Sequence, residues 1–209
     1  MAQPPLSPLT TPLEFWEARF AGSELVYGAE ANTFLAQQVA GLPPGTALCL
    51  AEGQGRNALH LARLGHRVIV QDLSSNGLAT ARTLAAAEGL AVETICGDLA
   101  DYRPEPESVD LLVAIWMQIP RVLRAEVIPR MVAACRPGGL LILEAYTPLQ
   151  LGRSSGGPQV LDLLVDPADL LIDAQGLELL HWQEGCREIS EGPAHRGLSA
   201  TVQLVGRRA

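Results

Sequence analysis

The chain has 209 residues, of which 48% are hydrophobic, which is enough apolar material for one well-buried domain of ordinary size. Its formal net charge is −8, and all fifteen basic residues are arginine because the sequence contains no lysine. Proteins that bind the nucleic acid backbone normally carry a basic patch or stripe. The sequence shows no such patch, so its composition argues against a nucleic acid partner.

The four cysteines, at positions 49, 96, 135 and 186, form no C-x-x-C pair and no Cys/His pair at metal-ligand spacing. We therefore expect buried free thiols in a reducing compartment, with neither a disulfide framework nor a metal site. The first residues lack the basic and apolar regions of a signal peptide, and no apolar run is long enough to span a bilayer. These features predict a cytoplasmic protein that does not contact the membrane, as a monomer or weak homodimer.

The N-terminal part is predicted to be a flexible tail over residues 1–11, followed by a single domain over 12–209. Thr11-Pro12-Leu13-Glu14 is a typical helix start, with Thr11 as the cap and Glu14 closing a capping box. A short helix over 12–22 and a second helix ending near Gly41 follow. Residues 12–41 are interpreted as a helical lid.

Apolar, strand-like runs then alternate with helical patterns. The expected strands are 46–51, 67–71, 91–96, 109–115 and 139–145, and the expected helices are 56–64, 75–88 and 121–135. Strands that are apolar throughout are typical of a sheet covered by helices on both faces. The alternation predicts an α/β fold with a Rossmann-like, doubly wound, mostly parallel sheet.

The last quarter of the chain has a different pattern. A helix near 167–175 is closed by Gly176, and two longer strand candidates follow at 177–189 and 198–206. These two segments are close enough in sequence to pair as an antiparallel hairpin. The sheet should therefore end with an antiparallel strand.

A glycine loop, "CLAEGQGRNA" at 49–58, lies between the first predicted strand and its helix. Gly53 and Gly55 allow the backbone to approach a ligand closely at the carboxyl edge of the sheet, where ligands bind in such folds. The G-x-G-x-x-A spacing fits a dinucleotide fingerprint and equally the shorter glycine loop of S-adenosylmethionine (SAM) enzymes. The loop could also carry its glycines for steric reasons alone.

Asp72 ends the second predicted strand, nineteen positions after Gly53. A carboxylate there can accept hydrogen bonds from both ribose hydroxyls of a nucleotide. Asp72 could instead cap the helix that begins at Ser74 or Ser75. Because both nucleotide interpretations predict this acid, it does not choose between them.

The third predicted strand ends in "ETICGDLADY", which places Asp98 and Leu99 at the same edge. Here, and in "SVDLLVAIW" and "CRPGGLLILEAYTP", the sequence resembles the class I SAM-dependent methyltransferases. The resemblance implies a seven-stranded sheet, SAM as cofactor with S-adenosylhomocysteine as product, and adenine held by Asp98 and Leu99. It also places Leu73 and Trp116 beside the cofactor.

The segments "FWEARFAGSELVYGAEANTFL", "GQGRNALHLA", "LEAYTPLQL", "GGP" and "EGPAHRGLSATVQL" are similar to the tellurite-resistance and thiopurine-methyltransferase-like branch. Gly53, Gly55, Arg56 and Asn57 match the G-x-G-R-N loop of that branch. The resemblance implies methylation of a small-molecule acceptor with a soft sulfur, selenium or tellurium nucleophile.

Five of the nine aromatic residues lie between 15 and 34. Two interpretations stay open for them: an inward-facing helix surface, which we prefer for Phe20 and Phe34, or a lid lined by Tyr27 and Trp16. The acid expected at 51 in SAM loops is replaced by Ala51 and followed by Glu52. Either the strand ends early and Glu52 turns toward the methionine end of the cofactor, which we favour slightly, or Glu52 pairs elsewhere.

Candidates for contact with the acceptor come from three segments, and each has a structural role as an equally good alternative. Gln118 follows the fourth strand, Tyr146 and Arg153 flank a long loop, and His195 and Arg196 precede the last strand. His60, His66 and His181 are interpreted as structural.

Two other functions remain open at this stage. One is a SAM-binding sensor without catalysis, which Ala51 and Gln118 keep open, and the other is an NAD(P)-binding oxidoreductase with the same glycine pattern. The second would normally need a further domain or further strands to build a substrate site, and the chain has no residues left for either.

Overall fold

A computed structural model describes residues 10–209. The tail predicted over 1–11 lies outside the described residues except for Thr10 and Thr11. Thr11 caps the first helix as expected: its side chain accepts a hydrogen bond from the backbone of Glu14, and the Glu14 carboxylate accepts one from the backbone of Thr11.

Seven strands form one sheet in the order β3-β2-β1-β4-β5-β7-β6. Strands β1 to β5 run parallel to one another, whereas β7 runs antiparallel to both β5 and β6. This arrangement confirms the predicted doubly wound, mostly parallel sheet with an antiparallel last strand. The strands are β1 (Thr46–Leu50), β2 (Arg67–Asp72), β3 (Val92–Cys96), β4 (Val109–Ile115), β5 (Cys135–Tyr146), β6 (Leu177–Ser190) and β7 (Arg196–Arg208).

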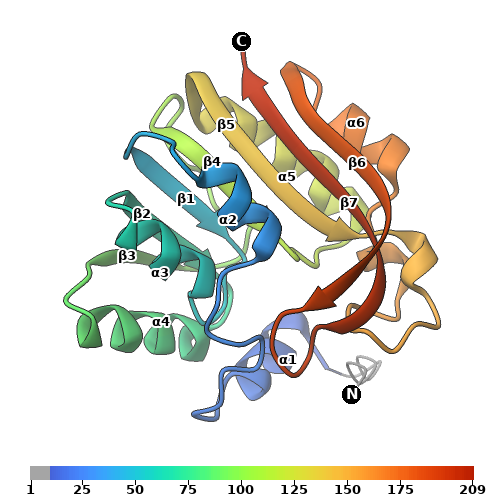
Figure 1. Ribbon diagram of the computed structural model, residues 1–209, viewed down its shortest axis with the longest axis horizontal. Helices are drawn as coiled ribbons and strands as arrows, with labels where there is room; N and C mark the ends of the chain where they lie inside the picture. The colour runs from blue at the N-terminus through green and yellow to red at the C-terminus, as the bar shows by residue number, and fades with distance from the viewer. Residues whose placement is uncertain (1–9) are drawn as a thin grey trace.

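Helices cover both faces of the sheet (Figure 1). Helices α2, α3 and α4 pack on one face and α5 and α6 on the other, whereas α1 lies beyond the edge of the sheet beside the start of α4. The helices are α1 (Pro12–Arg19), α2 (Thr33–Val39), α3 (Arg56–Arg63), α4 (Ser75–Ala87), α5 (Arg121–Ala134) and α6 (Pro167–Asp173), with 3-10 turns at Pro148–Gln150 and Leu161–Leu163.

The residues of β1 show why the strands are apolar throughout. Leu48 and Leu50 belong to the core cluster under α5, while Ala47 and Cys49 belong to the cluster under α2 and α3. Successive strand residues point to opposite faces, so a strand covered on both sides needs apolar residues at every position.

The element boundaries agree with the sequence pattern within a few residues, and β5 is the main difference. This strand begins at Cys135, whereas the sequence pattern predicts a strand that begins at residue 139. The register shifts between the pair Val109 and Cys135 and the pair Leu111 and Leu140, so residues 136–139 are accommodated as an irregularity within the strand.

The hairpin of β6 and β7 is longer than predicted and reaches past the sheet toward α1 (Figure 1). Its turn, residues 191–195, is closed by a hydrogen bond from the Glu191 N–H to the His195 carbonyl. Gly192 lies so close to the Tyr27–Gly28 backbone that a side chain at 192 would collide with it. The N-terminal segment and the C-terminal hairpin therefore meet at the carboxyl edge of the sheet.

Within residues 10–209, no helix has the length and apolar character needed to cross a membrane.

Gly55 ends the glycine loop and precedes α3 with φ +89°, and a Cβ placed there would lie 2.6 Å from the Cβ of Ala81. We predict that Gly55→Ala lowers the free energy of unfolding by the cost of the left-handed backbone, about 1–2 kcal/mol, plus about 1–3 kcal/mol of overpacking. Urea denaturation followed by circular dichroism measures this loss.

The matched control is Gly41→Ala, since Gly41 has φ +82° and a Cβ added there would meet no atom within 4 Å beyond the adjacent residues. This variant should lose only the backbone cost. An equal loss in both variants would contradict the packing argument for the loop.

Candidate functional site

One cavity of about 430 Å³ opens at the carboxyl edge of the sheet, between the glycine loop, the N-terminal segment and the turn of the hairpin. Its volume lies in the range of small-molecule sites. The sequence pattern predicted ten cofactor-binding residues, and all ten line this cavity. They are Tyr27, Glu52, Gly53, Gly55, Asn57, Asp72, Leu73, Asp98, Leu99 and Trp116.

The Asp72 carboxylate holds the glycine loop by a hydrogen bond and keeps lone pairs that can accept hydrogen bonds from a ligand. Its Oδ2 accepts a hydrogen bond of 2.7 Å from the N–H of Gly53, and its Oδ1 accepts one of 2.7 Å from the N–H of Ser74. Burial raises the pKa of the Asp72 carboxyl, and these two hydrogen bonds partly offset that effect. The helix cap of α4 is Ser74, so the alternative that Asp72 itself caps α4 is wrong.

Glu52 lines the cavity, but its carboxylate is held by the start of α3. Strand β1 ends at Leu50, before Ala51, as the favoured interpretation expected, but the Glu52 carboxylate is paired with the start of α3, as the alternative expected. Glu52 Oε1 then accepts hydrogen bonds from the N–H groups of Asn57 (2.7 Å) and Ala58 (2.9 Å). A carboxylate at this position satisfies the free N–H groups of a helix start. Burial raises the pKa of Glu52 against the effect of these donors.

The N-terminal aromatic residues form one wall of the cavity. Trp16 stacks on Phe20 with ring centroids 5.5 Å apart, and Phe20 meets Tyr27 edge to face at 6.3 Å. Both Trp16 and Tyr27 line the cavity, as the lid interpretation expected, and so does Phe20, for which a purely structural role was preferred. Phe34 is buried in the core against His181, away from the cavity.

Glu17 anchors this wall to the start of α4. Its carboxylate accepts hydrogen bonds from the N–H groups of Ser75 (2.7 Å) and Asn76 (3.2 Å) at the start of α4. Helix α1 is therefore attached to the rest of the fold through polar contacts at a helix N-terminus, because none of its own residues is buried.

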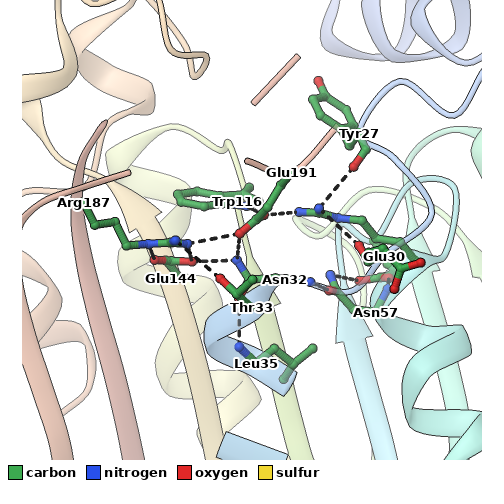
Figure 2. A network of polar contacts seen from close by, with 12 residues as sticks. Tyr27, Glu30, Asn32, Thr33, Leu35, Asn57, Trp116, Glu144, Arg187 and Glu191 are labelled. Carbon is green, nitrogen blue, oxygen red and sulfur yellow. Dashed lines mark hydrogen bonds and ion pairs between the residues drawn. The ribbon is translucent and has the colours of Figure 1, made fainter. Parts of the chain in front are cut away.

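Beneath the cavity, the carboxylate of Glu191 accepts hydrogen bonds from four donors on four segments (Figure 2). These are Arg56 NH2 at 2.8 Å, Asn32 Nδ2 at 2.9 Å, Trp116 Nε1 at 3.1 Å and Arg187 NH2 at 3.1 Å. Burial alone would oppose ionisation of Glu191, but the charges of Arg56 and Arg187 and the Trp116 and Arg56 hydrogen bonds lower its pKa to about 2.

A second carboxylate, Glu144 of β5, shares two of these donors and is fully buried. It accepts two hydrogen bonds of 2.7 Å from Arg187 and one of 2.6 Å from Asn32 Nδ2 (Figure 2). Gln203 donates a further hydrogen bond of 2.6 Å to it. Burial opposes the charge of Arg187, but its contacts with Glu144 and Glu191 raise the pKa of the guanidinium. Each buried charge is therefore paired and hydrogen-bonded, as stability requires.

Arg56 connects this network to the N-terminal segment. Besides Glu191, its guanidinium donates to the carbonyl of Tyr27 at 3.1 Å and to that of Glu30 at 3.5 Å. Asn57, the next residue, accepts a hydrogen bond from the Asn32 N–H at 2.9 Å. The R-N pair of the loop thus holds the N-terminal wall in place.

Sequence reasoning missed Asn32, Glu144, Arg187 and Glu191. Glu144 carried a visible signal, because it interrupts the apolar run "LLILEAY" of a strand that the pattern buries on both faces. Asn32, Arg187 and Glu191 had none, since they lie in loops or in an exposed strand and their partners are distant in sequence.

The acceptor candidates separate into two groups. Gln118 and His195 line the cavity. Tyr146 was expected to contact the acceptor, but it is not among the residues that line the cavity and stacks on Trp116 at 4.3 Å.

Arg153 and Arg196 were also expected near the acceptor, and they too are absent from the cavity lining. The Arg153 guanidinium donates to the carbonyls of Leu149 and Leu198, so its loop is folded back on β7. Arg196 is exposed, because it opens β7 on the strand's outer side.

Residues 47–139 match a family model described as a methyltransferase domain. The matched range includes the glycine loop, Asp72 and Asp98. This match indicates a methyltransferase domain over residues 47–139. SAM is the cofactor of such a domain.

Solved structures with related folds cover most of the chain. TehB from Haemophilus influenzae has a TM-score of 0.73 at 19% identity, covering 94% of this chain and 66% of TehB. A protein studied for the conversion of a disulfide bond into a thioacetal group during echinomycin biosynthesis has a TM-score of 0.74 at 21% identity, covering 94% of this chain and 91% of that one. At these identities the likeness establishes the fold.

Among curated proteins, the tRNA 5-carboxymethoxyuridine methyltransferase of Escherichia coli K12 is 31% identical over 101 residues. This match covers 45% of the chain and 37% of the relative, so the chain spans little more than a third of the length of that protein. The same protein of Escherichia coli O157:H7 matches equally.

The Glu191 network predicts a stability change with a defined pH dependence. Glu191→Gln leaves Arg56 buried without its counter-charge, which costs about 3–5 kcal/mol of unfolding free energy for a broken buried pair. The Glu191 pKa is depressed from 4.5 to about 2 on folding, so its contribution is fully present above about pH 4.5 and is lost as pH falls toward 2. Denaturant unfolding at several pH values measures both effects.

Glu184→Gln, an exposed acid on the strand that leads to Glu191, is the control and should change little. The free energy of unfolding of the wild-type protein should fall more steeply between pH 4.5 and 2 than that of Glu191→Gln. If both fall in parallel, the pH dependence does not come from Glu191.

Proposed function

We propose that the protein transfers a methyl group from SAM to a small-molecule acceptor. The observation that carries this proposal is the cavity at the carboxyl edge of a methyltransferase domain. Asp72 at the end of β2, the glycine loop and the pair Asp98–Leu99 line this one continuous space. The proposed lid, residues 12–41, covers that space with its aromatic residues.

The residues present fit the cofactor chemically. Each carboxylate oxygen of Asp72 accepts a hydrogen bond from the N–H of Gly53 or Ser74, and a second lone pair on each can accept from the two ribose hydroxyls. Asp98 and Leu99 are assigned to adenine. Glu52, Asp72 and Asp98 place negative charge around the cavity, and the rings of Tyr27 and Trp116 add aromatic faces, which suits a cationic ligand.

When bound, SAM supplies a methyl carbon already activated by its sulfonium, and the S–CH3 bond breaks with its electron pair staying on sulfur. The protein therefore has to position the acceptor in line and exclude water. The Glu191 network serves the first task, since it fixes Trp116 and the Arg56 loop on either side of the cavity. The aromatic wall of Phe15, Trp16 and Phe20 serves the second.

The small-molecule assignment rests on charge and on the resemblance noted above. A net charge of −8 without any lysine gives little attraction for a polyanion, and the branch resemblance favours a soft sulfur, selenium or tellurium nucleophile. Because one curated relative is a tRNA methyltransferase, tRNA must be among the acceptors that an experiment tests.

We predict that Asp72→Asn weakens the binding of S-adenosylhomocysteine about 10- to 100-fold, because a neutral amide replaces a charged acceptor of the ribose hydroxyls. Isothermal titration calorimetry measures the dissociation constant. The control is Asp101→Asn, because Asp101 is an exposed acid in the segment that follows β3. Unchanged affinity in Asp72→Asn would refute the ribose assignment.

The function itself is tested by incubating the protein with methyl-labelled SAM and separate acceptors: small thiols, selenite, tellurite and bulk tRNA. We expect label on a small molecule and none on tRNA. Binding of S-adenosylhomocysteine without transfer to any acceptor favours a sensor, and stabilisation by NADH in its place favours an oxidoreductase.

A further inference from the structure

One half of the cavity is mainly apolar. Its lining comes from the segment after β4, from the loop before α6 and from the hairpin turn, and we call it the acceptor wall. The acceptor wall includes Trp116, Ile119, Leu123, Val160, Leu163 and His195, and the same segments also contribute the polar residues Gln118, Gln159 and Asp162. An occupant of this half must present mainly apolar surface.

No free cation faces this space among residues 10–209. Arg56 is the one arginine in the cavity lining, and its guanidinium is already committed to Glu191 and to the carbonyls of Tyr27 and Glu30. Recognition of an oxyanion or carboxylate normally uses a free guanidinium or ammonium. The acceptor wall therefore lacks the group that an anionic acceptor requires.

Among the polar members of the acceptor wall, His195 has an unusual side chain. It is 2% exposed, and neither ring nitrogen has a hydrogen-bond partner within the described chain. Its ring lies 4.6 Å from that of Tyr27 and 5.4 Å from that of Trp116, so the imidazole is fixed between two aromatic neighbours.

The imidazole of His195 is neutral at physiological pH. Burial lowers its pKa to about 3, and the nearby charge of Arg56 acts in the same direction. The other charged groups around it are Glu191, Arg19 and Arg187, and the rings in contact include Tyr146. A neutral imidazole offers one donor and one acceptor, which suits an uncharged group such as a thiol or hydroxyl.

Resting on the proposed methyltransferase function, we propose that the acceptor is an uncharged molecule with an apolar body, and that His195 binds its polar group. An anionic acceptor such as selenite or tellurite finds no free counter-charge in this half of the cavity, and the acidic residue Asp162 lies in the lining instead. The site therefore selects uncharged acceptors over anionic ones.

A matched pair of thiols tests this proposal: benzyl mercaptan, which is neutral, and 4-(mercaptomethyl)benzoic acid, which adds a carboxylate to the same body. In each case the thiol sulfur bonds to the methyl carbon, the donor S–CH3 bond breaks with its electrons kept by S-adenosylhomocysteine, and the thiol proton leaves to water. We expect kcat/KM for the neutral thiol to be at least about tenfold higher, the cost of an unpaired charge in an apolar site.

Equal or faster transfer to the carboxylate, transfer to selenite or tellurite alone, or transfer to neither thiol overturns the proposal. A separate titration with S-adenosylhomocysteine tells which idea failed. If that ligand does not bind, the proposed function falls as well; if it binds while the thiol result is negative, only the acceptor class is wrong.

Two variants locate the effect. His195→Phe keeps the ring packing and removes both nitrogens, so KM for benzyl mercaptan should rise about tenfold while the affinity for S-adenosylhomocysteine stays unchanged. His181→Phe, a half-buried histidine packed against Phe34 outside the cavity, is the control. An unchanged KM in His195→Phe would overturn the role of His195.

Val160→Arg places a cation at the partly exposed rim of the acceptor wall, where folding should tolerate it. It should raise kcat/KM for 4-(mercaptomethyl)benzoic acid about tenfold without improving that for benzyl mercaptan. No change in preference would contradict the claim that charge decides acceptance.

Discussion

The carboxylate of Glu191 is the point on which the geometry of the site depends. Its four donors come from the N-terminal segment, the glycine loop, the end of β4 and strand β6, so one ionised group joins elements from every part of the described chain. Burying a charge is costly unless it is paired and hydrogen-bonded. The four segments must therefore be in place together, and this requirement gives the cavity fixed walls above a polar base.

Much of the fold follows from local signals in the sequence. The capping box at Thr11, the glycines before α3 and the apolar runs of β1 and β4 each act over a few residues, and the structure has those elements within a few positions. The cofactor side of the cavity was predictable for the same reason. Parallel strands bring their carboxyl ends to one edge, so Gly53, Asp72 and Asp98 had to converge.

The acceptor side could not be predicted in this way, because its contacts connect residues far apart in the chain. Asn32 and Glu191 are 159 positions apart, and Arg56 and Glu191 are 135 apart. Arg153 and Arg196 illustrate the limit, since the sequence places both near the edge of the sheet but cannot show that neither lines the cavity. The hairpin bends toward α1 (Figure 1). This path, which the sequence pattern does not reveal, puts His195 in the cavity lining and leaves Arg196 out of it.

A crystal structure of the complex with S-adenosylhomocysteine tests the central claim most directly, because it places both halves of the cavity at once. The account predicts the ribose hydroxyls on the Asp72 carboxylate, the adenine beside Asp98 and Leu99, and the sulfur directed toward the acceptor wall at Trp116 and His195. A ligand bound elsewhere, or one whose sulfur points away from that wall, would contradict it.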